Sequence, residues 1–276
     1  EQLVELGFEL SYAPVDKEGR VKVEELQKLI RKETILVSVM AVNNEIGAIQ
    51  PIEACATFIR EKSRAIFHVD AVQSFGKLPI SLTEAGPDAI TISGHKIHGL
   101  KGTGALISKR TMTPEAINYG GGQELGVRSG TVSVPDATAL ARAMRMASDR
   151  KKTASYEKWR KQLIEHIEQS DVAIVLAKET SAPHILSIAF ENIRGEVAVN
   201  FFQTNDIYLS TSSACSSKNG DLSHVIEAIH VPERFKDGVI RISFGENNTD
   251  AQIEQFKKVY TDFIHLLKRG KSHDVE

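Results

Sequence analysis

The sequence predicts an α/β protein, with a mostly parallel sheet in a large first domain and a smaller α/β domain after it. Three features indicate this class. Short apolar runs of strand length recur through the first half, helical patterns lie between some of them, and polar residues follow where the runs end. Strands that alternate with helices are typical of parallel sheets. Ligands bind outside the carboxyl ends of the strands in open sheets of this kind, so the polar residues also predict a site.

The composition is typical of a globular protein. Of the 276 residues, 41% are hydrophobic and 25% are charged, and 34 Lys and Arg nearly balance 36 Asp and Glu. This balance predicts neither nucleic acid nor a membrane surface as a direct partner. The two cysteines, Cys55 and Cys215, have neither the pattern of a disulfide framework nor zinc-ligand spacing. A reducing compartment fits such usage, so we expect a cytoplasmic protein without a metal site.

The first domain is predicted to occupy residues 1–150. Residues 7–12 read as a short strand, and apolar residues at helical spacing predict a helix at 23–30. The run at 34–40 is continuously apolar, which is typical of a strand covered on both faces. Pro51 opens a further helix that extends to about Lys62 and is expected to bury Cys55. Three more strands are predicted at 65–69, 89–92 and 104–108.

A long helix, expected from Pro135 to beyond Lys152, leads into the second domain at residues 151–276. The last helix of that domain has a capping box, with Thr249 as N-cap and Gln252 at the third helical position. Strands of the second domain are predicted at 185–190, 207–210 and 239–244.

Polar residues follow three consecutive strands of the predicted sheet, where the strands end. Each residue has an ordinary structural explanation on its own. A lysine in a glycine-rich turn is most often solvated, and an aspartate after a strand most often stabilises a turn. Three strand ends that each supply a polar cluster are harder to explain in this way. The residues concerned are Asn44, Asp70, Gln73, Ser93, His95 and Lys96.

Together these side chains match the chemical needs of pyridoxal phosphate. A lysine amine can form an imine with an aldehyde. An aspartate on a neighbouring strand can balance the positive charge of a pyridinium nitrogen, and an asparagine can hydrogen-bond the phenolic oxygen of the ring. Hydroxyl and imidazole groups near glycine-rich backbone can hold a phosphate.

Five motifs carry a family resemblance, in order along the chain. They are Asn-Asn-Glu-Ile-Gly at 43–47, His-Val-Asp-Ala-Val-Gln at 68–73, Ser-Gly-His-Lys at 93–96, Gly-Gly-Gln-Glu at 121–124 with Arg-Ser-Gly-Thr at 128–131, and Ser-Ala-Cys-Ser at 213–216. Together they resemble the cysteine desulfurases of the class-V aminotransferase group, which are fold type I pyridoxal-phosphate enzymes. Several related enzymes share the lysine motif, whereas a cysteine in a serine-rich loop is particular to desulfurases.

The resemblance implies a role for each polar residue at the strand ends. Lys96 would form the Schiff base with the cofactor and move the α-proton of the substrate. Asp70 would pair with the pyridinium nitrogen. Thr131 would reach the phosphate of the cofactor in a second subunit, which implies a homodimer. The remaining cofactor contacts would be Gln73 and Asn44 at the phenolic oxygen and Ser93 and His95 at the phosphate.

The resemblance also implies the substrate, L-cysteine. Arg241 would bind its carboxylate, with Asn44 nearby, although a strand arginine is also consistent with an ordinary salt bridge. Cys215 would attack the substrate sulfur, which leaves a persulfide on the enzyme and releases L-alanine. Residues 210–221 are polar, and Lys218 favours the nucleophilic thiolate. The sulfur would pass to acceptor proteins, either iron–sulfur scaffolds or enzymes of tRNA or thiamine thiolation.

The chain departs from the family pattern at its start. A phosphate-binding threonine and a histidine that stacks on the cofactor precede the shared motifs in the family, and neither is found here, so we expect that segment to be missing upstream. Two alternatives stay open: another pyridoxal lyase or aminotransferase of the same fold, and a non-catalytic scaffold relative. The presence of Lys96, Asp70 and Cys215 together argues against the scaffold.

Overall fold

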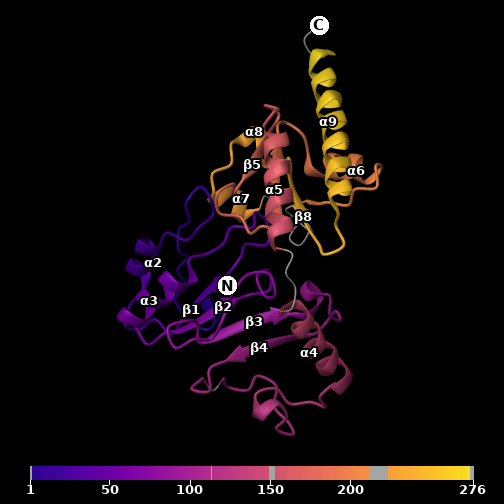
Figure 1. Ribbon diagram of the computed structural model, residues 1–276. Coiled ribbons are helices and arrows are strands. Elements are labelled where there is room, and N and C mark those ends of the chain that lie inside the picture. The colour runs from indigo at the N-terminus through magenta and orange to yellow at the C-terminus, as the bar shows by residue number, and fades with distance from the viewer. Residues whose placement is uncertain (1, 113, 149–152, 212–222, 274–276) are drawn as a thin grey trace. The chain divides into compact units, whose positions relative to one another are not determined.

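The computed structural model describes residues 2–112, 114–148, 153–211 and 223–273, with side chains described as far as residue 269 (Figure 1). The chain divides into two compact units. The first comprises Glu1–Ala13, Lys22–Val42 and Gln50–Arg150, and the second comprises Pro14–Val21, Asn43–Ile49 and Lys151–Glu276. The predicted single boundary at residue 150 therefore leaves out two short segments, 14–21 and 43–49, that belong to the second unit.

The first unit is built on a mostly parallel four-stranded sheet in the order β1-β2-β3-β4 (Figure 1). Strands β1 (Leu36–Met40), β2 (Ile66–Asp70) and β3 (Ala89–Ser93) are parallel, and β4 (Gly104–Ser108) runs antiparallel to β3. Because β1, β2 and β3 run in one direction, their carboxyl ends lie at one edge of the sheet. The expected α/β class with a mostly parallel sheet is confirmed.

One face of this sheet forms the core of the first unit. Phe67, Val69 and Ile92 are almost fully buried there. Helix α3 contacts β2, and α4 contacts the short 3-10 helix η1 that follows β3. The helices of this unit are α1 (Gln2–Glu5), α2 (Val23–Leu29), α3 (Ile52–Lys62) and α4 (Val134–Ser148), with the 3-10 turns η1 (Gly94–Ile97) and η2 (Glu124–Gly126).

The opposite face of the sheet is open within the part of the chain that the structure describes. Leu36, Ile66 and Leu106 are 47%, 40% and 53% exposed. The run at 34–40 was expected to be covered on both faces. Within the described residues this is wrong, because the face of the sheet that carries Leu36 is exposed. The predicted strand at 7–12 is also wrong, because these residues have no strand partner among the described residues and are exposed.

The second unit contains an antiparallel sheet in the order β5-β6-β8-β7. Its strands are β5 (Ala173–Leu176), β6 (Ile185–Phe190), β7 (Ser210–Thr211) and β8 (Val239–Ser243). The predicted strand at 207–210 is thus shorter and lies later, at β7. All six residues of β6 are buried, which is expected for a strand paired on both edges and covered on both faces.

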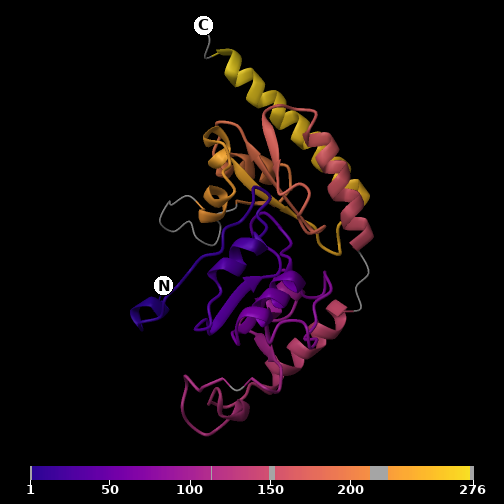
Figure 2. The same ribbon diagram turned by 90° about the vertical axis from the view of Figure 1, so that its left-hand side faces the viewer.

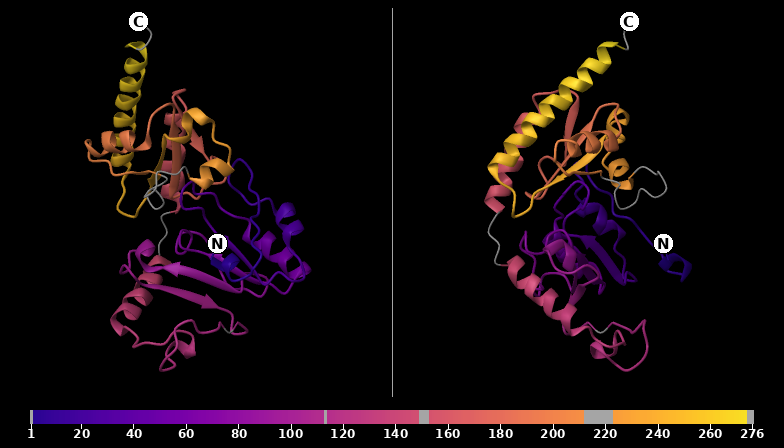
Figure 3. Two further views of the ribbon diagram at one scale, coloured as in Figure 1. Left: turned by 180° about the vertical axis from the view of Figure 1, so that it is seen from behind. Right: turned by 90° about the vertical axis from the view of Figure 1, so that its right-hand side faces the viewer.

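Helices α5 (Thr153–Ile167) and α9 (Asp250–His273) lie side by side in this unit (Figures 2 and 3). Aromatic side chains fill the space around them. Phe202 stacks on Phe256 with ring centroids 5.1 Å apart, and Phe263 meets Phe190 edge to face at 5.1 Å. The remaining helices are α6 (Gly195–Gln203), α7 (His224–Ala228) and α8 (Glu233–Lys236).

The capping box at the start of α9 is confirmed. The Gln252 side-chain oxygen accepts a hydrogen bond from Thr249 N at 3.1 Å, and Thr249 Oγ1 accepts one from Gln252 N at 3.4 Å. The long helix predicted from Pro135 is described only to Ser148, where α4 ends, and α5 begins at Thr153. Its continuation through 149–152 lies outside the described residues.

The two short segments of the second unit pack into its core. Ile46 and Ala48 are fully buried in a cluster with Ile226 and Ile229. Glu18 accepts hydrogen bonds from Glu179 N at 3.0 Å and from Thr180 Oγ1 at 2.9 Å. No helix in the described residues is long and apolar enough to cross a membrane.

Candidate active site

Lys96 lies on the tight turn η1, directly after β3. Gly94 N donates to Thr103 O at 2.8 Å, and a Cβ at Gly94 would overlap Thr103 Oγ1. Glycine is therefore required for this close approach of two backbone segments. The turn places Lys96 half-buried at the carboxyl edge of the parallel strands. Among the described residues, no hydrogen bond or ion pair involves the Lys96 amine.

Two further polar groups of the same turn lie together. Ser93 Oγ and His95 Nδ1 share a hydrogen bond of 2.8 Å, and His95 is exposed. The hydroxyl and the imidazole of this pair therefore lie at the same strand end as the Lys96 amine. Hydroxyl and imidazole donors next to glycine backbone are suited to an anion such as a phosphate.

Asp70 ends the neighbouring strand β2, where it lies opposite Thr91 of β3 in the parallel register. The half-buried Asp70 carboxylate accepts a hydrogen bond from Val72 N at 2.8 Å, which fixes its orientation. Gln73 follows in the next turn and is also half-buried. The sequence analysis predicted Asn44 at this edge together with Asp70, Gln73, Ser93, His95 and Lys96. The last five lie there, whereas Asn44 belongs to the second unit.

A hydrogen-bonded row crosses the open face of the sheet beside Asp70. His68 bonds Ser38 Oγ through Nδ1 at 2.8 Å and Thr91 Oγ1 through Nε2 at 2.7 Å. Burial lowers the pKa of His68, whereas the Asp70 charge acts in the opposite direction. This row was not predicted from sequence, because its members come from three strands.

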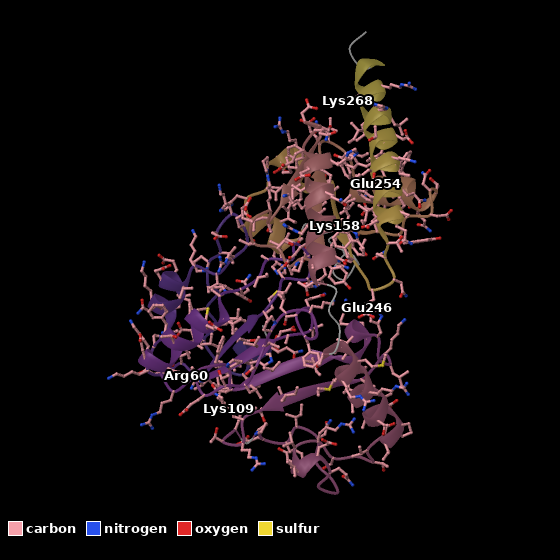
Figure 4. The ribbon with its side chains drawn as sticks, in the orientation of Figure 1. Arg60, Lys109, Lys158, Glu246, Glu254 and Lys268 are labelled. Atoms are coloured by element: carbon pink, nitrogen blue, oxygen red, sulfur yellow. The ribbon has the colours of Figure 1, made fainter. Side chains whose placement is uncertain are left out.

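A hollow of about 700 Å³ lies on this open face, near the start of β2 and β3, and His68 is part of its lining. Its lining includes Arg60 and Asp88, but not Lys96, so it does not coincide with the predicted site. Asp88 is bound at this end of the sheet by Lys109 at 3.0 Å and by Arg60 at 3.4 Å, and Figure 4 labels both basic residues.

Thr131 is exposed, in a loop that is held by its own hydrogen bonds. Ser129 N donates to Asn118 O at 3.1 Å, and Gly130 N donates to the side-chain oxygen of Gln123 at 3.1 Å. Leu125 of this loop is fully exposed. The role predicted for Thr131, toward a second subunit, is not tested by a single chain.

The second unit brings Arg241 and Asn44 together. Arg241 lies in the middle of a row across three strands, opposite Ser187 of β6 and Ser210 of β7. Its Nη1 donates to the backbone oxygen of Asn44 at 2.6 Å. The Asn44 side chain is half-buried.

The loop that carries Asn44 is held by the residues on either side of it. The Asn43 side-chain oxygen accepts hydrogen bonds from Glu45 N and Ile46 N, both at 2.9 Å. Sequence reasoning missed Glu45, which is buried against Ser223 and Ser187. The available signal was an acidic residue directly before the apolar residues Ile46, Ala48 and Ile49.

Cys215 lies outside the described residues. The structure describes both flanks of the segment that contains it. Strand β7 ends at Thr211, and Ser223 is the N-cap of α7, where its Oγ accepts a hydrogen bond from Val225 N.

The residues at the edge of the first sheet fit pyridoxal phosphate. An amine without a partner among the described residues suits the cofactor aldehyde, a carboxylate oriented by backbone suits the pyridinium nitrogen, and a hydroxyl–imidazole pair suits the phosphate. This fit rests on Lys96, Asp70, Ser93 and His95, which all belong to the first unit.

Comparison with known proteins gives consistent results. The family model described as aminotransferase class-V matches residues 1–256. A NifS/IcsS protein homolog of Lactobacillus delbrueckii subsp. bulgaricus is 40% identical over 98% of this chain and 72% of its own length. A cysteine desulfurase IscS of Methanosarcina thermophila is 35% identical over 95% of this chain and 65% of its own length.

Solved structures agree. A NifS-like protein matches with a TM-score of 0.87 at 38% sequence identity. The match spans 97% of this chain and 70% of the NifS-like chain. SspA in complex with cysteine matches with a TM-score of 0.73 at 30% sequence identity. The match spans 88% of this chain and 68% of the SspA chain. The chain therefore belongs to the class-V aminotransferase family and, within it, to the pyridoxal-phosphate-dependent cysteine desulfurases.

Proposed function

We propose that the chain takes L-cysteine as substrate, transfers its sulfur to Cys215 and releases L-alanine. The S–Cβ bond of the substrate breaks, an S–S bond forms to the Cys215 sulfur, and Cβ gains a proton. Thiol plus cysteine thus becomes persulfide plus alanine, and no external oxidant or reductant is needed. The observation that carries the proposal is the Lys96 amine, which has no partner among the described residues and follows β3, the strand next to the one that ends at Asp70.

Bound pyridoxal phosphate supplies an electron sink that allows bonds at the α-carbon and β-carbon of an amino acid to break. Lys96 would hold the cofactor and carry the α-proton at its Nζ. The negative charge of Asp70 would keep the ring nitrogen protonated. The hydrogen bond from Val72 N, at 2.8 Å, orients the carboxylate. Gln73 and Asn44 would bond the phenolic oxygen, while Ser93 and His95 would hold the phosphate.

Arg241 would bind the substrate carboxylate. A guanidinium can bind a carboxylate through two parallel hydrogen bonds, which fixes direction as well as position. The hydrogen bond from Arg241 Nη1 to Asn44 O, at 2.6 Å, restricts the guanidinium to one orientation. Substrate binding by a pre-oriented group costs less side-chain entropy.

We also propose a homodimer in the cytoplasm, in which Thr131 of one subunit serves the cofactor phosphate of the other. The exposed apolar side chains of its loop, Ile117, Tyr119 and Leu125, support a protein partner on this surface. The persulfide would pass to an acceptor protein, either an iron–sulfur scaffold or a tRNA- or thiamine-thiolation enzyme.

Replacement of the nucleophile tests the proposal. The Cys215→Ser variant, loaded with pyridoxal phosphate, should form no alanine from cysteine and carry no persulfide. Cys55→Ala is the matched control, because Cys55 is fully buried and should not affect turnover. Alanine formation that persists in Cys215→Ser would instead favour another pyridoxal lyase or aminotransferase. Lys96→Ala should lose the visible absorption of the bound cofactor, and a protein that never gains this absorption would favour the scaffold alternative.

A further inference from the structure

His68 is a half-buried histidine of β2 to which the proposed reaction gives no role. Its ring is bonded on both sides, from Nδ1 to Ser38 Oγ at 2.8 Å and from Nε2 to Thr91 Oγ1 at 2.7 Å. Burial lowers the pKa of His68 and the Asp70 charge only partly opposes this, so the ring is neutral at pH 7. A neutral imidazole donates through one nitrogen and accepts through the other, whereas a hydroxyl does either. The row can therefore run in two directions.

The Asp70 carboxylate is next to this row. Residues two apart on a strand point to the same face, so His68 and Asp70 share the open face of the sheet. Asp70 lies opposite Thr91 in the parallel register of β2 and β3. Neighbouring strands are about 4.8 Å apart. Thr91 is therefore a neighbour of both the imidazole and the carboxylate.

The charge of Asp70 favours one direction of the row. If Thr91 donated to Nε2, the lone pairs of its hydroxyl would be left for the carboxylate side, and like charges would repel. If Nε2–H donates to Thr91 and Ser38 donates to Nδ1, the hydroxyl hydrogen of Thr91 is left for that side instead. In the low dielectric of a half-buried site this difference is larger than in water. The row should run from Ser38 through His68 to Thr91.

The carboxylate itself is held from one side only. Asp70 Oδ1 accepts the hydrogen bond from Val72 N at 2.8 Å. Within the described part of the chain, no hydrogen bond reaches Oδ2. The dipole of a hydroxyl on the adjacent strand would restrain this second oxygen. A group that is oriented before its ligand arrives binds at a lower entropic cost.

We propose that His68 and Thr91 are positioning residues for the Asp70 carboxylate. The neutral imidazole donates from Nε2 to Thr91, and Thr91 turns its hydroxyl hydrogen toward Asp70, which keeps the carboxylate oriented for the ring nitrogen of the cofactor. This role rests on the proposed function, in which Asp70 pairs with that nitrogen. The row should therefore affect cofactor binding through the ring nitrogen and not through the phosphate or the aldehyde.

The test compares two ligands of the cofactor-free protein, pyridoxal phosphate and its carbocyclic analogue, in which a CH group replaces the ring nitrogen. Thr91→Val should weaken binding of pyridoxal phosphate about fivefold, the effect of one hydrogen bond, and change binding of the analogue less than about twofold. Thr91→Ser keeps the hydroxyl and should bind both ligands like the parent. His68→Gln keeps an amide donor near the place of Nε2, so it should bind pyridoxal phosphate more tightly than His68→Asn, whose side chain is too short to reach Thr91.

Thr57→Val is the matched control for the loss of a threonine hydroxyl. Thr57 lies on α3 in the same unit, where its Oγ1 donates to Glu53 O at 3.1 Å, and its replacement should leave both affinities unchanged. A loss of packing alone would weaken both ligands equally in Thr91→Val, because the analogue has the same shape as the cofactor. Equal weakening of the two ligands, or no weakening of either, would overturn the proposed role.

The direction of the row is tested without any ligand. Nuclear magnetic resonance of protein with isotope-labelled histidine should show a neutral His68 ring that is protonated at Nε2 at pH 7. The spectrum of His68→Gln identifies its signal among the nine histidines. A ring that is protonated at Nδ1, or at both nitrogens, would contradict the proposed direction.

Asp70→Asn distinguishes failure of this role from failure of the proposed function. It should weaken binding of pyridoxal phosphate and leave binding of the analogue unchanged. If Asp70→Asn changes neither affinity, Asp70 does not pair with the ring nitrogen, and the assignment in the proposed function fails. If Asp70→Asn weakens pyridoxal phosphate alone while Thr91→Val and His68→Asn bind it like the parent, only the role of His68 and Thr91 fails.

Discussion

Gly47 is a position where a single added methyl group should be costly. It lies in the Asn43–Ile49 segment with φ +79°, in the left-handed region that L-residues avoid. A Cβ there would overlap Ser181 Oγ and lie 2.9 Å from both Cβ and Cγ2 of Ile185. Ser181 cannot move freely, because its Oγ donates to Ile185 O at 2.8 Å. Ile185 is buried in β6.

The expected loss for Gly47→Ala has two contributions. The left-handed backbone costs an alanine about 1 kcal/mol. Relief of the overlap with a β-branched residue in a packed strand adds about 1–3 kcal/mol. Gly102→Ala is the matched control, since Gly102 has φ +81° and no atom lies within 4 Å of the place that a Cβ would take there. It should lose only the backbone contribution, about 1 kcal/mol.

Urea unfolding followed by far-ultraviolet circular dichroism measures both variants against the parent. Gly47→Ala should shift the midpoint at least twice as far as Gly102→Ala. Equal shifts would refute the reasoning, because they would mean that the segment yields to the extra methyl without cost.

Three further outcomes follow from buried and half-buried groups. Burial raises the pKa of Cys55 to about 11, so its thiol should stay protonated and unreactive at pH 8. A thiol reagent at pH 8 should therefore modify one cysteine, Cys215, in the native protein and none in Cys215→Ser. Modification of Cys55 would contradict this. Burial alone would raise the pKa of Asp88, but Phe67 N, Lys109 and Arg60 together hold it below its ordinary value. The stability that Asp88 confers is thus present above about pH 4 and lost as pH falls through the lowered pKa. Asp88→Asn should therefore destabilise the protein at pH 7 and progressively less as the pH is lowered below about 4 in urea titrations; an effect that does not decrease would contradict this. Leu163→Ala, at a fully buried core position, should cost about 2–5 kcal/mol by Trp159 fluorescence in urea, and a loss below about 1 kcal/mol would show that the core closes around the gap.

Local signals were readable from the sequence. The capping box of α9 involves residues three apart, and the strands of the first sheet are short apolar runs, so both follow from neighbouring residues. The strand expected at 7–12 failed for the converse reason. A strand requires a partner to pair with its backbone, and none is present among the described residues.

The edge of the first sheet was predictable because parallel strands place their carboxyl ends together, whatever their order. The hydrogen bond from Arg241 to Asn44 was not, since it joins residues 197 apart in the chain. It depends on the antiparallel register of β6, β7 and β8, which no local pattern specifies. Glu45 was missed for the same reason, because its partner Ser223 is 178 residues away.

The interleaved path of the chain has a consequence for how the protein is made. Residues 14–21 and 43–49 leave the ribosome early, but the strands and helices that bury them are synthesised only after residue 151. Ile46 and Ala48 therefore stay exposed until the residues that bury them, after residue 151, have been synthesised. For the same reason no single cut separates the units: a fragment starting at residue 151 would lack both segments and expose Ile226 and Ile229 to water.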